Sequence, residues 1–392
     1  MTTRIATARS TSATDAAPAF LELQKQLGGA EPSLVVVFAS TSAPLEGVMK
    51  AAAHAFPKAN TIGCTTAGEF TEASEGKAQF VAWALAGDDV TVTAGLGTGL
   101  KADPEAALES AIKLAADDAE RPHRMAILLL DPLSGNGEEA SMLAMTMLGP
   151  TVRLAGGAAG DDLHFKQTLV ACGNQVASDA VVVALLSSRR PLGIGVKHGH
   201  KPMSKPLTVT KAEGSVVHEL DGKPAFGVWK DAVRAAVQAE GADIDAIALA
   251  DVGGHLLRYE VGLIAGANEY KIRAPLSADA AGAVSFACGI PEGAVVRITS
   301  SAESDQISSA RDAAERARKA LGGAKVAGAL VFDCICRNLI LGPKFGAAVK
   351  EIHEGLGGAP IAGFETYGEI AMDLGQSSGF HNTTTVVLAF PA

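Results

Sequence analysis

The feature that most constrains the fold is an order of patterns that occurs three times along the chain. Each time, a helical pattern leads to a short apolar run, then to a second helical pattern, a glycine-rich acidic turn and a closing apolar run. Short β-branched runs bounded by polar residues are typical of strands buried on both faces. The central runs are 33–40, 125–132 and 327–334, and the closing runs are 80–86, 180–187 and 384–390.

The helical patterns beside these runs carry the usual end signals. Asp103 precedes Pro104, as a cap precedes the first helical residue, and basic residues followed by a glycine pair end the pattern at 303–321. The expected helices are 15–27, 104–119 and 303–321 before the central runs, and 44–55, 137–148 and 343–356 after them. Strands that alternate with helices predict an α/β fold, with two domains of repeated strand–helix–strand units and mixed sheets.

The division into domains rests on weaker signals. The stretch 188–215 is rich in proline, glycine and basic residues and lies near the middle of the chain. It is the best candidate for a domain boundary, which predicts domains at 1–200 and 201–392, and the basic loop 197–205 within it is expected to be a solvated connector. A fourth, weaker copy of the unit is expected in 240–300, with a strand at 245–251. Four units could then form two sheets of two units each.

Two of the acidic turns share a skeleton. The turns are "GCTTAGE" (63–69), "GGAAGDD" (156–162) and "GFETYGE" (363–369), and the middle one lacks the threonine. The matching residues are Gly63, Thr66 and Glu69 in the first turn and Gly363, Thr366 and Glu369 in the third. Open α/β sheets place ligands at the carboxyl ends of their strands, where these turns lie. The turns are therefore candidate ligand sites, although tight-turn chemistry alone would also explain the residue types.

Three further residues are candidates for the same site. Asp333 ends the last central run, and Arg337 follows it and could hold a ligand carboxylate in bidentate fashion. Glu69 or Glu369 could hold an amine, so the set would suit an amino acid in a cleft between the two halves. His381 could bind the ligand, ligate haem iron, or staple its hairpin through Asn382 and Thr383.

Composition excludes several classes of protein. The formal net charge is −10 and there is no basic patch, which argues against nucleic-acid binding. No run approaches the ~20 apolar residues of a membrane-spanning helix, and no signal peptide is evident. Five scattered cysteines indicate reduced thiols and a cytoplasmic setting.

Known site motifs are also missing. The segment "GLGTGL" (95–100) misses the dinucleotide fingerprint by one position and is expected to be a loop. The acidic turns lack the Lys-Ser or Lys-Thr of a phosphate loop. Cys334 and Cys336 are expected on one face of a strand, without a second pair at zinc spacing.

Beyond these patterns, the chain resembles the FIST family. "TIGCTTAGEF" and "LAGGAAGDDLHF" resemble its N-terminal domain, and "LVFDCICR", "IAGFETYGEI" and "FHNTTTVVL" resemble its C-terminal domain. The resemblance implies a sensory protein that binds a small ligand, for which amino acids have been suggested. It also implies a haem-binding nitric-oxide sensor as an alternative, because some members bind haem. A separate kinase, cyclase or chemotaxis receptor is the implied signalling partner.

A cysteine-dependent hydrolase is the alternative from another class. Cys334 or Cys336 would attack, with His381 as the base and Asp333 orienting it. A buried strand explains the cysteines equally well, and no Gly-x-Ser-x-Gly elbow exists.

Overall fold

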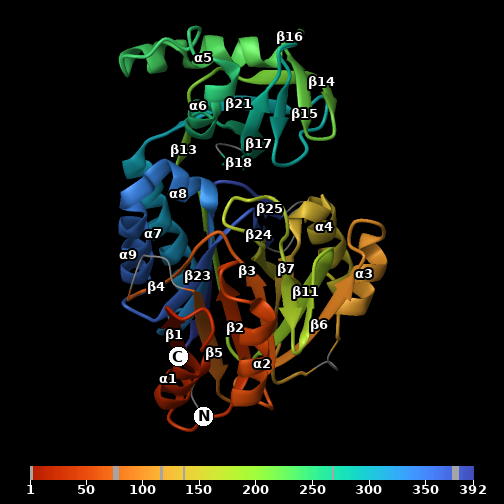
Figure 1. The fold of residues 1–392 in the computed structure, drawn as a ribbon, viewed down its shortest axis with the longest axis vertical. Coiled ribbons are helices and arrows are strands. Elements are labelled where there is room, and N and C mark those ends of the chain that lie inside the picture. Colours follow the sequence, from red (N-terminus) through yellow and green to blue (C-terminus); the bar gives the residue numbers. More distant parts are fainter. Residues whose placement is uncertain (1–2, 74–78, 115–117, 136, 267–268, 373–378) are drawn as a thin grey trace.

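The protein consists of a three-sheet body and an insertion, as its computed structural model shows (Figure 1). The structure describes residues 3–73, 79–114, 118–135, 137–266, 269–372 and 379–392. We use "insertion" for residues 198–301, which interrupt the third sheet, and "body" for the remainder. The insertion lies at one end of the long axis, and both chain termini lie near the other end (Figure 1).

Each sheet of the body mixes parallel and antiparallel pairs, which confirms the predicted α/β class. In the first sheet the strand order is β1-β5-β2-β3-β9-β10, and only β2 and β3 pair in parallel. Its strands are β1 (Arg4–Ser10), β2 (Pro32–Ala39), β3 (Asn60–Thr65), β5 (Phe80–Ala86), β9 (Val170–Cys172) and β10 (Gln175–Ala177).

The other two sheets follow the same plan. The second has the order β25-β24-β8-β7-β11-β6 and the third has the order β12-β26-β22-β23-β4. The strands of the second are β6 (Val90–Thr98), β7 (His123–Leu130), β8 (Val152–Ala158), β11 (Ala180–Ser188), β24 (Glu369–Met372) and β25 (Phe380–His381). Those of the third are β4 (Glu69–Thr71), β12 (Gly193–Lys197), β22 (Val326–Cys334), β23 (Ile361–Thr366) and β26 (Thr385–Pro391).

The short strand after each acidic turn leaves its own sheet and completes another. β4 follows β3 but pairs with β23 of the third sheet, and β24 follows β23 but pairs with β8 of the second. β9 follows β8 and pairs with β3 of the first sheet, which closes the cycle. Each sheet therefore depends on a strand from a different part of the chain.

Alternation along the central strands explains how the sheets pack. Val36 and Phe38 of β2 point into a core shared by all three sheets, whereas Val35 and Val37 point to the helices outside. Strands β7 and β22 divide their side chains in the same way. The outer helices are α1 (Ala17–Leu27), α2 (Leu45–Ala55), α3 (Pro104–Ala111), α4 (Gly137–Leu148), α7 (Glu303–Lys319) and α9 (Phe345–Gly355).

Helix α3 ends earlier than the sequence predicted, although part of the expected helix, 115–117, lies outside the described residues. The segment "GLGTGL" was also predicted wrongly, because Gly95 and Gly97 lie inside strand β6. A Cβ atom at Gly97 would lie 1.8 Å from the carbonyl oxygen of Ala107 in α3. These glycines therefore allow the helix backbone to approach the strand, which is a packing role.

The insertion is an antiparallel sheet, and it replaces the expected fourth unit. Its strand order is β18-β17-β21-β14-β15-β20-β19, with β13 beside β21 and β16 beside β15. The strands are β13 (His200–Pro202), β14 (Leu207–Glu213), β15 (Val216–Leu220), β16 (Lys223–Pro224), β17 (Val261–Gly266), β18 (Glu269–Arg273), β19 (Pro275–Ala278), β20 (Val284–Phe286) and β21 (Val295–Ser301). Helices α5 (Ala225–Ala239) and α6 (Gly253–Arg258) accompany this sheet.

Two expectations for this region are corrected. Residues 245–251 form a loop and a short 3-10 turn instead of a strand, and all of them except Ile247 are exposed, so they supply no buried face. The loop 197–205 is not a wholly solvated connector, because it begins at the last residue of β12 in the third sheet and His200 of β13 within it is buried. The domain boundary near residue 200 stays a prediction.

Candidate functional site

The three acidic turns meet at one junction in the body. They come from three different sheets, and backbone hydrogen bonds join each turn to the other two. The bonds run from Gly160 N to Thr65 O (2.9 Å), from Ala67 N to Glu365 O (3.1 Å) and from Ala158 N to Gly368 O (2.7 Å). The recurring turn therefore holds the ends of three sheets together.

The threonine and glutamate of the shared skeleton bond to each other inside this junction. Thr66 Oγ1 donates to Glu69 Oε2 at 2.6 Å, and the Thr366 hydroxyl donates to the Glu369 carboxyl group in the same way. Glu369 also accepts a bond from the backbone N–H of Thr384 at 3.1 Å. Burial raises the pKa of Glu369 well above its usual value. These polar groups are satisfied internally and do not face an open cleft.

The third element of the predicted site, Asp333 with Arg337, is also internal. Arg337 lies in α8 (Ile335–Leu341), four residues after Asp333, and its Nε donates to Asp333 Oδ1 at 2.6 Å. Both side chains are fully buried. The guanidinium also donates to the side chain and the backbone carbonyl of Gln306 and to Ser309 Oγ, and so it ties α8 to α7. Its use as a carboxylate clamp stays a prediction, and these protein partners would compete with a ligand.

Glu365 belongs to the junction and was missed by the sequence analysis. Burial raises its pKa to about 8, and Asn338 Nδ2 donates to its Oε1 at 2.6 Å. A Cβ atom at Gly68 would lie 2.7 Å from this carboxyl group, which explains the second glycine of the turn. The sequence did contain a signal for this, namely the alternation of side chains along β23. Phe364 points into the shared core, so its neighbour Glu365 points to the opposite face of the sheet.

A cleft between the body and the insertion brings together polar groups from both parts. Its volume is about 1010 Å³, and His381 and Thr384 of the body line it together with His198, Lys271 and Arg273 of the insertion. In Figure 1 it lies where β13 and β18 face α7 and β25. Of the predicted site residues, the structure places His381 here, whereas Gly63, Thr66 and Glu69 belong to the junction.

Polar contacts hold the insertion against the body at this cleft. Arg273 Nη2 donates to Glu138 Oε1 of α4 at 2.6 Å, and its Nη1 donates to the Phe380 carbonyl at 3.1 Å. The backbone N–H of Ala274 donates to Asn382 Oδ1 at 3.3 Å. Interfaces of this polar kind permit relative movement of the parts they join.

The inner wall of the cleft carries one lysine and two neutral imidazoles. Lys271 is only 8% exposed, and burial together with the neighbouring charge of Arg273 lowers its pKa to about 8. Burial and the Lys271 charge lower the pKa of His381 to about 3, and burial lowers that of His198 to about 4. Near neutral pH both imidazoles are therefore uncharged.

The His381 side chain links the two strands of its own hairpin, but not through Asn382 and Thr383 as expected. Its Nε2 bonds to the Ala371 carbonyl at 3.0 Å, across the β24–β25 pair. His198 Nε2 bonds to the Tyr270 carbonyl at 3.0 Å. Both rings would have to give up these bonds to ligate haem iron through Nε2, so neither His381 nor His198 fits an axial haem ligand in this arrangement. The described residues also contain no cluster of His, Cys, Asp and Glu suited to a metal ion.

The geometry gives no support to a cysteine hydrolase. Asp333 pairs with Arg337, and His381 bonds to a backbone carbonyl, so the three groups do not form a relay. Burial raises the pKa of the Cys334 thiol well above its usual value, which disfavours the thiolate. Cys336 lies in α8 and not on the strand face with Cys334, because β22 ends at Cys334.

A buried pair lies beside the two chain crossings that connect the insertion to the body. His200 Nε2 and Glu260 Oε2 are 3.6 Å apart, both side chains are fully buried, and neither atom has a hydrogen-bond partner. Burial lowers the pKa of His200 and raises that of Glu260, so burial favours the neutral form of each group. Thr383 Oγ1 of the body donates to Glu260 Oε1 at 2.7 Å, which joins the insertion to the body here.

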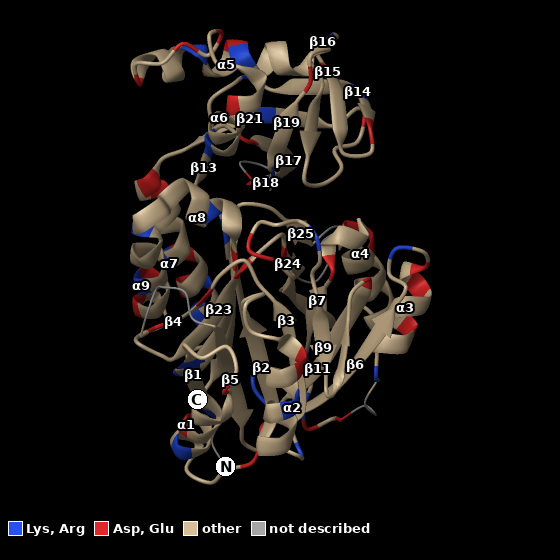
Figure 2. Cartoon of the chain, in the orientation of Figure 1, with Lys and Arg blue, Asp and Glu red and all other residues tan. Residues whose placement is uncertain are grey.

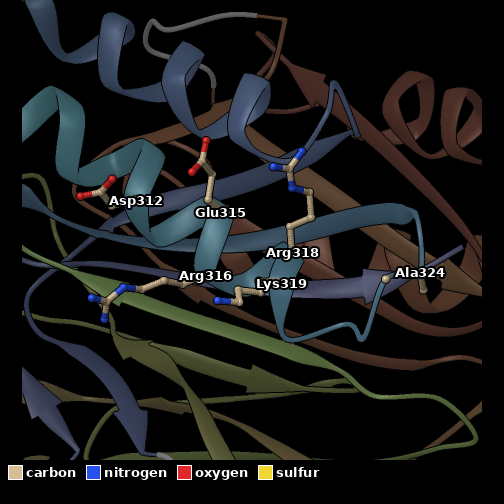
Figure 3. Close-up of a pocket in the computed structure, with 7 residues that line it drawn as sticks. Asp312, Glu315, Arg316, Arg318, Lys319 and Ala324 are labelled. Atoms are coloured by element: carbon tan, nitrogen blue, oxygen red, sulfur yellow. The ribbon is translucent and has the colours of Figure 1, made fainter.

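A second hollow of about 770 Å³ lies on the outer side of α7. Figure 3 shows its charged side chains pointing in different directions from the helix, and they include Asp312, Glu315 and Arg318. These three residues are exposed. Lys, Arg, Asp and Glu residues are scattered over helices and loops of both the body and the insertion (Figure 2), so this hollow is not distinguished by charge. We therefore assign the candidate site to the cleft.

Family models match most of the chain. The model of the FIST N domain matches residues 33–223, and the model of the FIST C domain matches residues 225–372. FIST domains are associated with sensory ligand binding in signal transduction. No described helix is long and apolar enough to cross a membrane.

Relatives span the chain to different extents. An uncharacterized protein of Mycobacterium tuberculosis is 26% identical over 397 residues, which cover 96% of this chain and 95% of that protein. One from Mycobacterium bovis is 29% identical over 256 residues, 62% of this chain and 61% of that protein. One from Methanocaldococcus jannaschii is 37% identical over 76 residues, 19% of this chain and 15% of that protein. The match thus spans less than two thirds of the latter two relatives.

Proposed function

Because the chain belongs to the FIST family, we propose that it is a sensory protein that binds an amino acid or a similar small metabolite in the cleft between insertion and body. The observation that carries this proposal is the convergence of Lys271 from the insertion and His381 from the body on one cleft. A ligand held by both parts favours one relative position of the two, which is the differential binding that a sensor needs.

The cleft offers complementary chemistry for such a ligand. The buried ammonium of Lys271 is a partner for a carboxylate, and His381 and the Thr384 hydroxyl add neutral polar groups. Thr384 also connects the cleft to the junction of the turns, since its N–H bonds to Glu369. We assign the remaining predicted residues, Asp333 and Arg337 among them, to the scaffold that supports this wall.

Closure of the cleft is the proposed signal. The chain crosses between body and insertion at β13 and at the end of β21, which pair with each other. A hinge at two adjacent crossings lets the insertion rotate as a unit. A separate kinase, cyclase or receptor would detect the closed form.

The test is a thermal-shift screen of the full chain against amino acids and other small carboxylates. A ligand that binds only the folded state raises the melting temperature. Lys271→Met should weaken binding of that ligand by roughly tenfold to a hundredfold, the scale of one charged hydrogen bond. Lys319→Met, on the exposed end of α7, is the matched control and should bind normally. Normal binding by Lys271→Met would place the ligand elsewhere.

A further inference from the structure

Two buried polar atoms near the crossings between insertion and body face each other without partners. They are His200 Nε2 and Glu260 Oε2, which lie 3.6 Å apart in fully buried side chains and have no hydrogen-bond partner among the described residues. A buried polar atom without a hydrogen bond costs free energy, so the pair calls for a physical explanation. The hydrogen bonds around the pair supply one.

The bonds of Thr299 show where the His200 ring carries a hydrogen. Thr299 Oγ1 donates to the backbone carbonyl of Glu260 at 2.9 Å, and this carbonyl can only accept. Because a hydroxyl group has one hydrogen, the Thr299 oxygen must accept in its 3.1 Å contact with His200 Nδ1, and Nδ1 must donate. Nδ1 therefore carries a hydrogen, and any further proton on the ring lies on Nε2, which faces Glu260.

A count of protons leaves one satisfactory state for the pair of His200 and Glu260. With no further proton, a carboxylate lies buried beside a neutral imidazole, and with two, an imidazolium lies buried beside a neutral acid. Each of these states buries a net charge, which is costly. With one proton between Nε2 and Oε2 the pair is neutral, and both atoms gain the hydrogen bond they lack. The shared proton should draw the two atoms together toward the ordinary hydrogen-bond range of about 2.7–3.2 Å.

The surroundings do not compensate a net charge on the pair. The titratable and charged groups that act on it, directly or through an ion pair, come from the segment before β13, from α8, from the end of β22 and from β24, and they are His198, Arg337, Asp333 and Glu369. Arg337 opposes a positive charge on His200, and Glu369 opposes a negative charge on Glu260. The neutral state with one proton is the one that both neighbours tolerate.

The pair is also a point at which the insertion is held on the body. Thr383 Oγ1, in the turn before β26, donates to Glu260 Oε1 at 2.7 Å. The φ angle of Thr383 is 50°, a left-handed conformation that is rare for a β-branched residue. Residues strained in this way persist only where their surroundings hold them, and they cluster at functional contacts. Separation of the insertion from the body would break this contact and admit water to Glu260.

We propose that His200, Glu260 and Thr383 form a proton-linked latch, in which the His–Glu pair holds one proton while the insertion is seated on the body and releases it to solvent when the insertion separates in neutral or alkaline solution. In water, histidine loses its proton near pH 6.5, about two units above the pH at which glutamate ionises. Above that pH the separated pair therefore holds no proton. Raising the pH should then favour separation by up to about tenfold per pH unit.

Hydrogen exchange of the Ala274 amide in the full chain measures this separation. Its N–H, in the insertion, donates to Asn382 Oδ1 of the body, so exchange requires this contact to open. After correction for the intrinsic exchange rate, the protection factor of the wild type should fall about a hundredfold relative to that of Glu260→Gln between pH 6.5 and 8.5, because the variant has no acid proton to release. Glu292→Gln, at an exposed turn of the insertion, is the matched control and should follow the wild type. A constant ratio between wild type and Glu260→Gln overturns the latch.

A second measurement needs no variant. In wild-type protein labelled with 15N-histidine, the ring nitrogens of His200 should show a hydrogen on Nδ1 at pH 7, and their shifts should stay unchanged between pH 6 and 8. A His200 ring that titrates near the ordinary value of about 6.5, or that carries its hydrogen only on Nε2, overturns the latch. The inference goes beyond the proposed function and does not rest on it. Both measurements are made without ligand, so they leave the sensory function to its own test.

Discussion

The junction of the three turns and the cleft both contain concentrated polar side chains, but they use them in opposite ways. At the junction, Thr66 bonds to Glu69 and Arg337 bonds to Asp333, so partners come from the body itself. In the cleft, Lys271 and His381 come from different parts of the molecule and line an open volume. The comparison indicates that the most recognisable sequence motif builds the scaffold, whereas the proposed ligand site lies where the insertion meets it.

The largest expected effect tests whether the junction is scaffold. Arg337→Met leaves the Asp333 carboxyl group buried without its partner, which should lower the free energy of unfolding by about 3–5 kcal/mol. Arg234→Met is the control, because among the described residues Arg234 makes ion pairs only at the surface, with Asp231 and Asp245. Urea denaturation measures both. If Arg337→Met is as stable as the wild type but no longer binds ligand, Arg337 belongs to the ligand site and not to the scaffold.

The next effect depends on pH. Burial raises the folded-state pKa of Glu365 to about 8, above its unfolded value, so its contribution to stability is complete at low pH and is lost as pH rises from about 4.5 through 8. Glu365→Gln mimics the protonated acid and should be more stable than wild type by a few kcal/mol near pH 9. The difference should shrink as pH falls and approach zero below the unfolded pKa of about 4.5, which is the internal control. A constant difference at all pH values would contradict a buried neutral acid.

A smaller loss is expected at the threonine–glutamate pairs. Thr66→Val and Thr366→Val each remove a hydroxyl donor from a buried carboxyl group, at a cost of about 1–3 kcal/mol. Thr71→Val is the matched control, since Thr71 is buried in β4 and has no side-chain hydrogen bond among the described residues. Thermal unfolding of the three variants checks this. Equal stability of all three would show that the pairs are not structural.

The smallest effect on stability is expected in the cleft. Arg316 lines the cleft from the exposed face of α7, so Arg316→Met should change the free energy of unfolding by no more than about 0.5 kcal/mol. If its charge helps to attract an anionic ligand, calorimetry should show that Arg316→Met binds this ligand more weakly than the wild type does. Added salt should then weaken binding to the wild type more than binding to the variant. A large loss of stability would mean that cleft and junction are not separable.

Particular elements show how far the sequence predicts this fold. The runs at 33–40, 125–132 and 327–334 correspond to β2, β7 and β22, because an unbroken β-branched run has few alternatives to a doubly buried strand. The acidic turns were predicted at strand ends and lie there. The sequence analysis did not predict that β4, β9 and β24 each join a different sheet from the strand before them. Strands of three or four residues are too short for their hydrophobic pattern to indicate which strand they pair with.

The insertion shows where local pattern fails. Its strands are short and antiparallel, and one of them, β13, lies within a segment whose proline, glycine and basic residues favour a connector. The contacts that hold Arg273 in place come from Glu138 and Phe380, which are more than a hundred residues away in the chain. No local signal could have indicated a cleft at this point.

By itself, the sequence determined the α/β class, the central and closing strands of the three units, the positions of the turns and the family, because these depend on hydrophobic periodicity and turn chemistry that act over a few residues. The tertiary structure alone decided that the strand after each turn completes a neighbouring sheet and that the Thr–Glu and Asp–Arg groups are buried inside the body. It also decided that Lys271 and His381 share a cleft. The physical reason is that burial and partner choice are set by elements distant in the chain, and a side chain's pKa and contacts follow from those neighbours and not from its own local sequence.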